Sequence, residues 1–118
     1  MKLLPSLKQK KRYILFEIKP MSEPMSVEHF FSFSDIQQEV DRALLLFLGR
    51  LGLAKAVPLL VKEQCEENRF TIKVNHQYVD EVKSAVLFIK SIKNSPVIVR
   101  SITTSGTLKK LKKAGEVP

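Results

Sequence analysis

The chain has 118 residues, of which 44% are hydrophobic and 27% are charged, a balance typical of one globular domain. One cysteine excludes an intrachain disulfide, and with only two histidines it cannot complete a structural zinc site. No secretory leader is predicted, because the apolar run after Met1 ends at Pro5, and the longest apolar run, residues 43–48, is too short to span a membrane. We therefore expect one soluble, cytoplasmic domain over residues 1–118.

The positive charge is concentrated in two segments. Twenty Lys and Arg against twelve Asp and Glu give a net charge of +8. Residues 1–12 contribute +5 and residues 100–118 contribute +4, which leaves −1 for residues 13–99. Such segregation favours a polyanionic partner, although basic tails that only aid solubility are the simpler alternative. We expect nucleic acid rather than a membrane, because residues 107–113 hold only two leucines among their lysines.

The first half of the chain predicts a lead-in, a strand and a helix. Residues 1–11 form a basic extended lead-in, and residues 12–19 alternate as a strand that Pro20 closes. Ser34 and Gln37 have the spacing of a capping box. Apolar residues then recur at helical spacing as far as Gly49 or Gly52, which we expect to end the helix: Ile36, Val40, Ala43, Leu44, Phe47, Leu48 and Leu51.

The second half predicts a hairpin, a second helix, a strand and a short basic helix. In chain order these are residues 53–63 and 69–74, 75–93, 97–102 and 107–114. Asn75 is the expected cap of the second helix, and Pro96 follows its end. Strand, helix, strand, strand, helix, strand predicts an α+β fold, a ferredoxin-like or RNA-recognition-type βαββαβ sandwich. In that fold a four-stranded antiparallel sheet has both helices on one face.

Catalysis by this chain is not predicted. His29 and His76 lie in different segments with no Ser or Cys beside either, and Cys65 has no cation nearby to activate a thiolate. Glu63, Glu66 and Glu67 are close in sequence, but acidic turns of this kind are usually solvated. We expect no catalytic residues, no metal ligands and no cofactor bound by the chain.

The sequence favours contacts to phosphates over the reading of bases. The predicted strand at residues 69–74 has one aromatic and no glycine, unlike the RNA-recognition signature. Its outward positions would be Arg69, Thr71 and Lys73, with Tyr13 and Arg100 on neighbouring strands. Such a face binds the RNA backbone, so its affinity should depend strongly on salt.

The helices have more apolar residues than one sheet face can bury. Residues 43–48 are apolar all around the first helix. Packing between the two helices is one explanation, and a protein partner is the other. The residues expected at a partner surface are Leu45, Leu46, Leu53, Leu87 and Phe88.

Three segments of the chain resemble one known family. Residues 2–14, residues 75–82 (NHQYVDEV) and residues 97–107, which end in Ser-Gly-Thr before a lysine-rich stretch, are similar to archaeal ribonuclease P protein component 2. The similarity covers most of the chain in the same order. The resemblance implies a subunit of the ribonucleoprotein that removes the 5′ leader of precursor tRNA, in which magnesium-dependent RNA is the catalyst. It also implies a TIM-barrel partner, protein component 3, in a two-plus-two assembly, together with further ribonuclease P proteins.

The expected RNA-binding groups are the basic residues of both charged segments and a Ser-Gly-Thr turn that presents backbone N–H groups. These residues are Lys8, Lys10, Lys11, Arg12, Arg100, Ser105, Gly106, Thr107, Lys109, Lys110, Lys112 and Lys113. Two other functions fit the sequence. One is a stand-alone RNA-binding accessory module, such as a ribosome-associated protein, and the other is a ferredoxin-like oligomerisation or ligand-binding domain.

Overall fold

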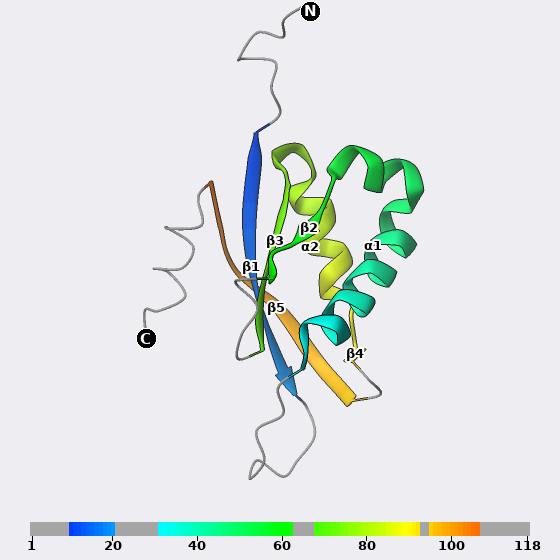
Figure 1. The fold of residues 1–118 in the computed structure, drawn as a ribbon, viewed down its shortest axis with the longest axis vertical. Helices are drawn as coiled ribbons and strands as arrows, with labels where there is room; N and C mark the ends of the chain where they lie inside the picture. The colour runs from blue at the N-terminus through cyan, green and yellow to red at the C-terminus, as the bar shows by residue number, and fades with distance from the viewer. Residues whose placement is uncertain (1–9, 21–30, 63–67, 93–94, 107–118) are drawn as a thin grey trace, which may run out of the picture.

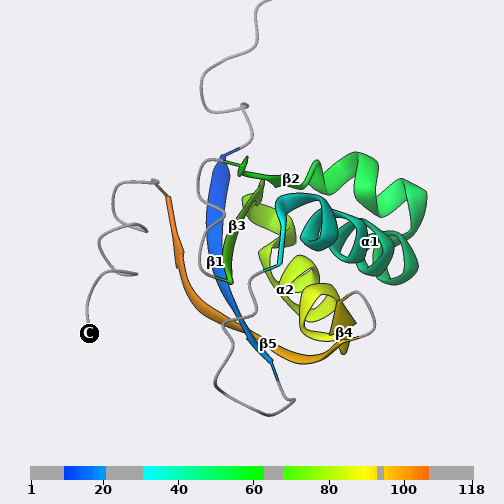
Figure 2. The same cartoon turned by 60° about the horizontal axis from the view of Figure 1, so that its bottom comes forward.

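The structure, a computed structural model, describes residues 10–20, 31–62, 68–92 and 95–106 (Figure 1). Its elements are β1 (Lys11–Pro20), α1 (Phe33–Ala56), β2 (Leu59–Leu60), β3 (Arg69–Asn75), the 3₁₀ turn η3 (His76–Tyr78), α2 (Val79–Leu87), β4 (Ser91–Ile92) and β5 (Ser95–Ser105). The strands form one antiparallel sheet in the order β2-β3-β1-β5-β4. The sheet is curled, and α1 and α2 lie side by side on one of its faces (Figure 2). The α+β class is therefore confirmed.

The core lies between the three long strands and the two helices. The alternation of β1 puts Ile14, Phe16 and Ile18 on the helix side, where all three are buried. Phe16 stacks on Phe70 of β3, with ring centroids 5.1 Å apart. The helices cover these side chains with small and branched apolar residues: Ile36, Val40 and Leu44 from α1, and Val82, Ala85 and Val86 from α2.

The central strand β1 fixes which residues share a face. Tyr13 is the register partner of Lys73 on β3 and of Ser105 on β5. A register shift between Leu15 and Phe16 marks an irregularity in the pairing with β5. Beyond it, Glu17 is the partner of Arg69 and of Arg100. Cross-strand partners point to the same face, so these rows of side chains lie opposite the helices.

The first helix differs from its prediction at both ends. Its cap is Ser32 rather than Ser34, and the Ser32 hydroxyl accepts a hydrogen bond from the backbone N–H of Asp35 at 3.2 Å. Gly49 does not end the helix but kinks it, with φ 73° and ψ 175°, a conformation open essentially to glycine alone. The chain then resumes helical geometry to Ala56, and Val57 caps it in the left-handed region.

The predicted strand over residues 53–63 is wrong for most of its length. Residues 53–56 are the last turn of α1, because Ala56 is fully buried and Leu53 packs against the core. Leu59 and Leu60 pair with β3, and the backbone N–H of Val61 donates to the carbonyl oxygen of Thr71 at 2.9 Å. Pro58 precedes them and has no N–H to offer a neighbouring strand, in keeping with this short edge strand. Residue 63 lies outside the described residues.

The sheet has five strands rather than the predicted four. The second helix ends at Leu87, and Ile92, which falls within the predicted helix at residues 75–93, lies in β4 and is buried there. β5 extends from Ser95 to Ser105, which is longer than the predicted strand at 97–102. The predicted basic helix over residues 107–114 falls outside the described residues. No helix in the described part of the chain is long and apolar enough to cross a membrane.

Candidate nucleic-acid interface and partner surface

Charge separates the two layers of the fold. The three long strands β1, β3 and β5 contain six basic residues against one acid, a net of +5. In α1 three acids balance three bases, and α2 has two acids and one base, so the helices together have a net charge of −1. A polyanion is therefore attracted to the strands rather than to the helices.

The described ends of the two basic segments lie side by side. β1 begins where β5 ends, because the two strands are antiparallel and Tyr13 is the partner of Ser105. A Cβ atom placed on Gly106 would lie 3.6 Å from Nη1 of Arg12. Lys10 is exposed next to this point, and its carbonyl oxygen accepts from the backbone N–H of His76 at 2.8 Å. The structure therefore brings Lys10, Arg12, Ser105 and Gly106 together.

Other predicted RNA-binding residues are placed differently. Arg100 lies at Glu17, four residues along β1 from Tyr13, which corresponds to about 13 Å at the usual rise of a strand. It therefore belongs to a second cationic position on the sheet and not to the group around Arg12. The remaining members of the prediction are outside the described residues: Lys8, Thr107, Lys109, Lys110, Lys112 and Lys113.

Glu17 pairs with both arginines of the second cationic position. Both Nε and Nη2 of Arg100 lie close to Oε1 of Glu17, at 2.9 and 2.7 Å, and Nε of Arg69 lies 3.5 Å from Oε2. The sequence analysis missed Glu17 as a site residue. Its outward position in the alternating strand, opposite two outward arginines, was the available signal.

The sheet face opposite the helices is less exposed than predicted. Thr71 is fully buried and its partner Leu15 is 6% exposed, so neither is available to a phosphate. Lys73 remains half-buried, with its ammonium 6.0 Å from the centroid of the Tyr13 ring. The accessible charged groups on this face therefore lie in two cross-strand rows, one at Tyr13 and Lys73 and the other at Glu17, Arg69 and Arg100.

Asn75 connects the first cationic group to the fold. The buried Asn75 side chain accepts a hydrogen bond from the Lys11 ammonium, and its amide donates to the carbonyl oxygen of Lys55 at 2.5 Å. The prediction that the Asn75 side chain caps the following helix is therefore wrong, because this side chain makes no capping hydrogen bond. It ties the end of α1 to the start of β1, and it makes Lys11 a structural residue as well as a cation.

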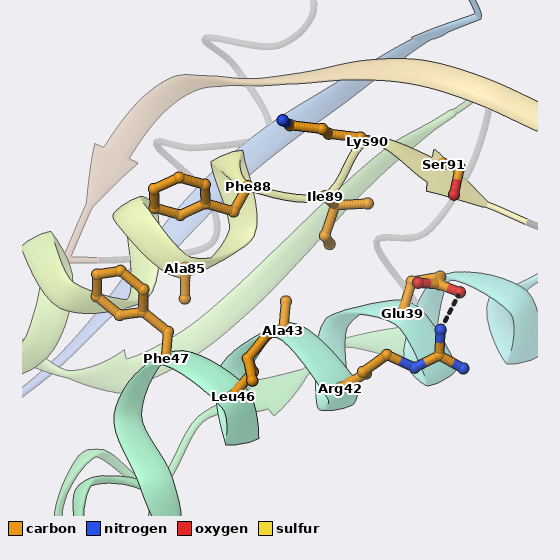
Figure 3. Close-up of a pocket in the computed structure, with 10 residues that line it drawn as sticks. All are labelled: Glu39, Arg42, Ala43, Leu46, Phe47, Ala85, Phe88, Ile89, Lys90 and Ser91. Carbon is orange, nitrogen blue, oxygen red and sulfur yellow. Dashed lines mark ion pairs between the residues drawn. The ribbon is translucent and has the colours of Figure 1, made fainter.

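The helix side has an apolar groove between α1 and α2. Phe47 and Phe88 face each other across it, with ring centroids 5.6 Å apart, and Leu46 at its rim is 86% exposed (Figure 3). The cavity has a volume of about 440 Å³ and is lined by Glu39, Arg42, Ala43, Leu46, Phe47, Ala85, Phe88, Ile89, Lys90 and Ser91. Exposed aromatic rings in contact are typical of a protein-binding surface.

The predicted partner residues do not form one surface. Leu45 and Leu53 line a separate hollow with Val57, on the other side of α1 from the groove. Leu87 is 44% exposed and lines neither. Phe47 and Leu51, which share the helical apolar spacing with the buried Val40 and Leu44, are both exposed, and Phe47 was not among the predicted partner residues. Phe47 lies in the run that is apolar all around the helix, and that run was the available signal.

The described residues offer no set of metal ligands. No group of three or more His, Cys, Asp or Glu lies together within them. His76 is exposed in η3, whereas His29 and Cys65 fall outside the described residues.

Basic strands on one side and an apolar groove between the helices on the other define a small α+β protein with two chemically distinct surfaces. The family model of the Rpp14/Pop5 family, whose name marks it as a ribonuclease P family, matches residues 12–115. The chain belongs to this family.

Relatives support the same conclusion. The ribonuclease P protein component 2 of Thermococcus kodakarensis is 33% identical over 94% of this chain and 87% of its own length. The proteins of the same name from Pyrococcus furiosus and Methanocaldococcus jannaschii are 32% and 31% identical, over 94% and 93% of this chain and 87% and 75% of their own lengths. The predicted resemblance, and the prediction of a ribonuclease P protein subunit, are therefore confirmed.

A solved structure shares the fold. One chain in the cryo-EM structure of yeast ribonuclease MRP superposes with a TM-score of 0.66. The match covers 98% of this chain and 95% of that one at 19% identity.

Proposed function

We propose that this ribonuclease P subunit holds the catalytic RNA in its active form while the RNA removes the 5′ leader of precursor tRNA. The observation that carries the proposal is the separation of charge from apolar surface, with +5 on the long strands and the apolar groove between the helices. The chain contributes binding, and the RNA contributes the cleavage chemistry. Magnesium belongs to the RNA, and the chain binds no cofactor of its own.

The sheet side is the proposed RNA side. Lys10 and Arg12 are close to the end of β5, where Ser105 and Gly106 lead into the second basic segment. Basic residues brought together from two segments neutralise phosphates where RNA strands approach each other, which favours the folded RNA. Five lysines outside the described residues are proposed to extend this surface: Lys8, Lys109, Lys110, Lys112 and Lys113.

The helix side is the proposed protein side. Protein component 3, the TIM-barrel subunit that the family resemblance implies, is proposed to fill the groove at Leu46, Phe47 and Phe88. Large side chains that are exposed in the free protein lose water contact when a partner covers them, and aromatic residues contribute strongly to such interfaces. We further propose a two-plus-two assembly with that subunit, joined to the other protein subunits of the particle.

Reconstitution tests this function. Ribonuclease P RNA, this chain and protein component 3 are combined, and cleavage of precursor tRNA is measured while each component is omitted in turn. We expect cleavage at low magnesium to require all three components, and the RNA alone to recover activity at high magnesium. Cleavage by the chain without the RNA would contradict the proposal, as would an RNA whose activity does not change when the chain is left out. The stand-alone RNA-binding alternative predicts instead that omission of component 3 has no effect.

A further inference from the structure

Glu17 lies at the centre of a three-strand charge cluster. It is the only acid on the described strands β1, β3 and β5, and its register partners on both sides are arginines. Arg100 contacts Oε1 through two nitrogens, and Arg69 approaches Oε2. Each oxygen of one carboxylate is therefore directed at a different guanidinium group.

The cluster keeps a net charge of +1 and stays accessible. The Glu17 side chain is 17% exposed, whereas those of Arg69 and Arg100 are 41% and 55% exposed. Ion pairs at this level of exposure contribute little to stability, so stability alone does not account for two arginines on one acid. A carboxylate that fixes two guanidinium groups reduces their conformational freedom, and this lowers the entropic cost of binding an anion.

We propose that Arg69 and Arg100, held in place by Glu17, form a binding site for one phosphodiester group of the RNA backbone. This inference rests on the proposed function and adds a second contact point to it, about 13 Å along β1 from the group at Arg12. Arginine suits the ligand because its planar fork of donors matches phosphate oxygens. Glu17 is a positioning residue that also limits the charge of the site. RNA is favoured over an acidic protein because the three long strands have a net charge of +5.

The test compares charge variants of the full chain in complex with component 3. The dissociation constant for ribonuclease P RNA is measured at several salt concentrations for Arg69→Gln, Arg100→Gln and Glu17→Gln, and thermal unfolding checks the fold of each. The matched control is Arg50→Gln on α1, which removes an exposed arginine that lines neither the groove nor the hollow at Leu45.

We expect each of the two sheet arginine variants to weaken RNA binding several-fold. Because both arginines bind one phosphate, the double variant Arg69→Gln with Arg100→Gln should reduce the log–log salt slope by about 0.7–0.9 in total, the loss of one phosphate contact. Glu17→Gln should tighten binding several-fold, because the net charge rises to +2 while the amide oxygen still accepts from Arg100. Arg100→Lys keeps the charge but not the fork, so it should weaken binding and leave the salt slope unchanged. Arg50→Gln should behave as the wild type.

Two results would overturn the site while the wild-type complex still binds RNA. The sheet arginine variants could match Arg50→Gln, or they could lose component 3 and keep the RNA, which would indicate an acidic protein partner. If the wild-type complex fails to bind the RNA, the proposed function itself is contradicted.

Discussion

The ammonium group of Lys11 on β1 donates a hydrogen bond to the buried side-chain carbonyl of Asn75, its register partner on β3. The Asn75 amide continues the connection to the carbonyl oxygen of Lys55 in the last turn of α1. One side chain thus links the start of the central strand, the end of the long helix and a cation of the proposed RNA surface. The stability of the fold and the geometry of that surface are coupled at this point.

Asn75→Ala is expected to lower the free energy of unfolding by about 1–3 kcal/mol, because it removes the two part-buried hydrogen bonds of this side chain, to the Lys55 carbonyl oxygen and to the Lys11 ammonium. Urea denaturation followed by circular dichroism measures the loss. Gln77→Ala, an exposed change two residues away, is the control and should shift stability by less than about 0.5 kcal/mol. Equal stability of the two variants would show that the Asn75 contacts contribute nothing.

Lys10→Ala combined with Arg12→Ala is expected to reduce cleavage of precursor tRNA by the reconstituted particle at low magnesium. The physical reason is the loss of two cations at the start of β1, one of them, Arg12, beside Gly106. The change should also lower the salt slope of RNA binding by about 0.7–0.9 for each phosphate contact removed. Lys11 is left intact, because its removal would also disturb Asn75. Full activity of the double variant at low magnesium would contradict the charge model.

Gly49→Ala is expected to destabilise the protein by about 1–3 kcal/mol, because alanine disfavours the backbone conformation at the kink. Nothing lies within 4 Å of where the new Cβ would be, so the cost comes from the backbone and not from a clash. Differential scanning calorimetry measures the change. Arg50→Ala, at an exposed neighbouring position, should leave the melting temperature close to that of the wild type. A fully stable Gly49→Ala protein would show that the helix runs straight through.

Leu46→Asp is expected to abolish the complex with protein component 3, because it puts a charge at the rim of the Phe47–Phe88 groove that binding would have to bury. Size-exclusion chromatography of the mixed proteins measures complex formation. The matched variant Leu45→Asp alters the neighbouring residue, which lines the separate hollow with Leu53, and should keep the complex. The reverse pattern would move the interface to that hollow.

The sequence predicted the fold class and the long strands because their alternation follows from burial on one face. Ile14, Phe16 and Ile18 alternate along β1 and are buried, as are Phe70 and Val74 at the positions of β3 that alternate with the predicted outward residues. Local patterns failed where tertiary contacts decide the structure. Gly49 resembles a helix stop in sequence, but the turns beyond it are helical and place Ala56 in the core. Ile92 falls within the predicted helix at residues 75–93, yet pairing with Ser95 makes it part of a strand.

The candidate site was predicted in its charge and not in its geometry. Counting residues was enough to expect basic groups near Arg12, but whether Arg100 joins them depends on strand register, which places it at Glu17. For the partner surface, the surplus of apolar residues on α1 was visible in the sequence. The direction in which Phe47 points depends on how α1 packs beside α2, so its pairing with Phe88 could not be derived from spacing alone.

Ultraviolet crosslinking of the reconstituted particle tests most directly the central claim, that RNA binds the sheet side and protein binds the helix side. Aromatic residues on both sides provide comparable reporters, namely Tyr13 on β1, and Phe47 and Phe88 in the groove. After RNA digestion and peptide mapping, we expect RNA adducts on peptides from β1, β3 and β5, with Tyr13 among them, and none on peptides containing Phe47 or Phe88. RNA adducts at Phe47 and Phe88 with none at Tyr13 would contradict the account.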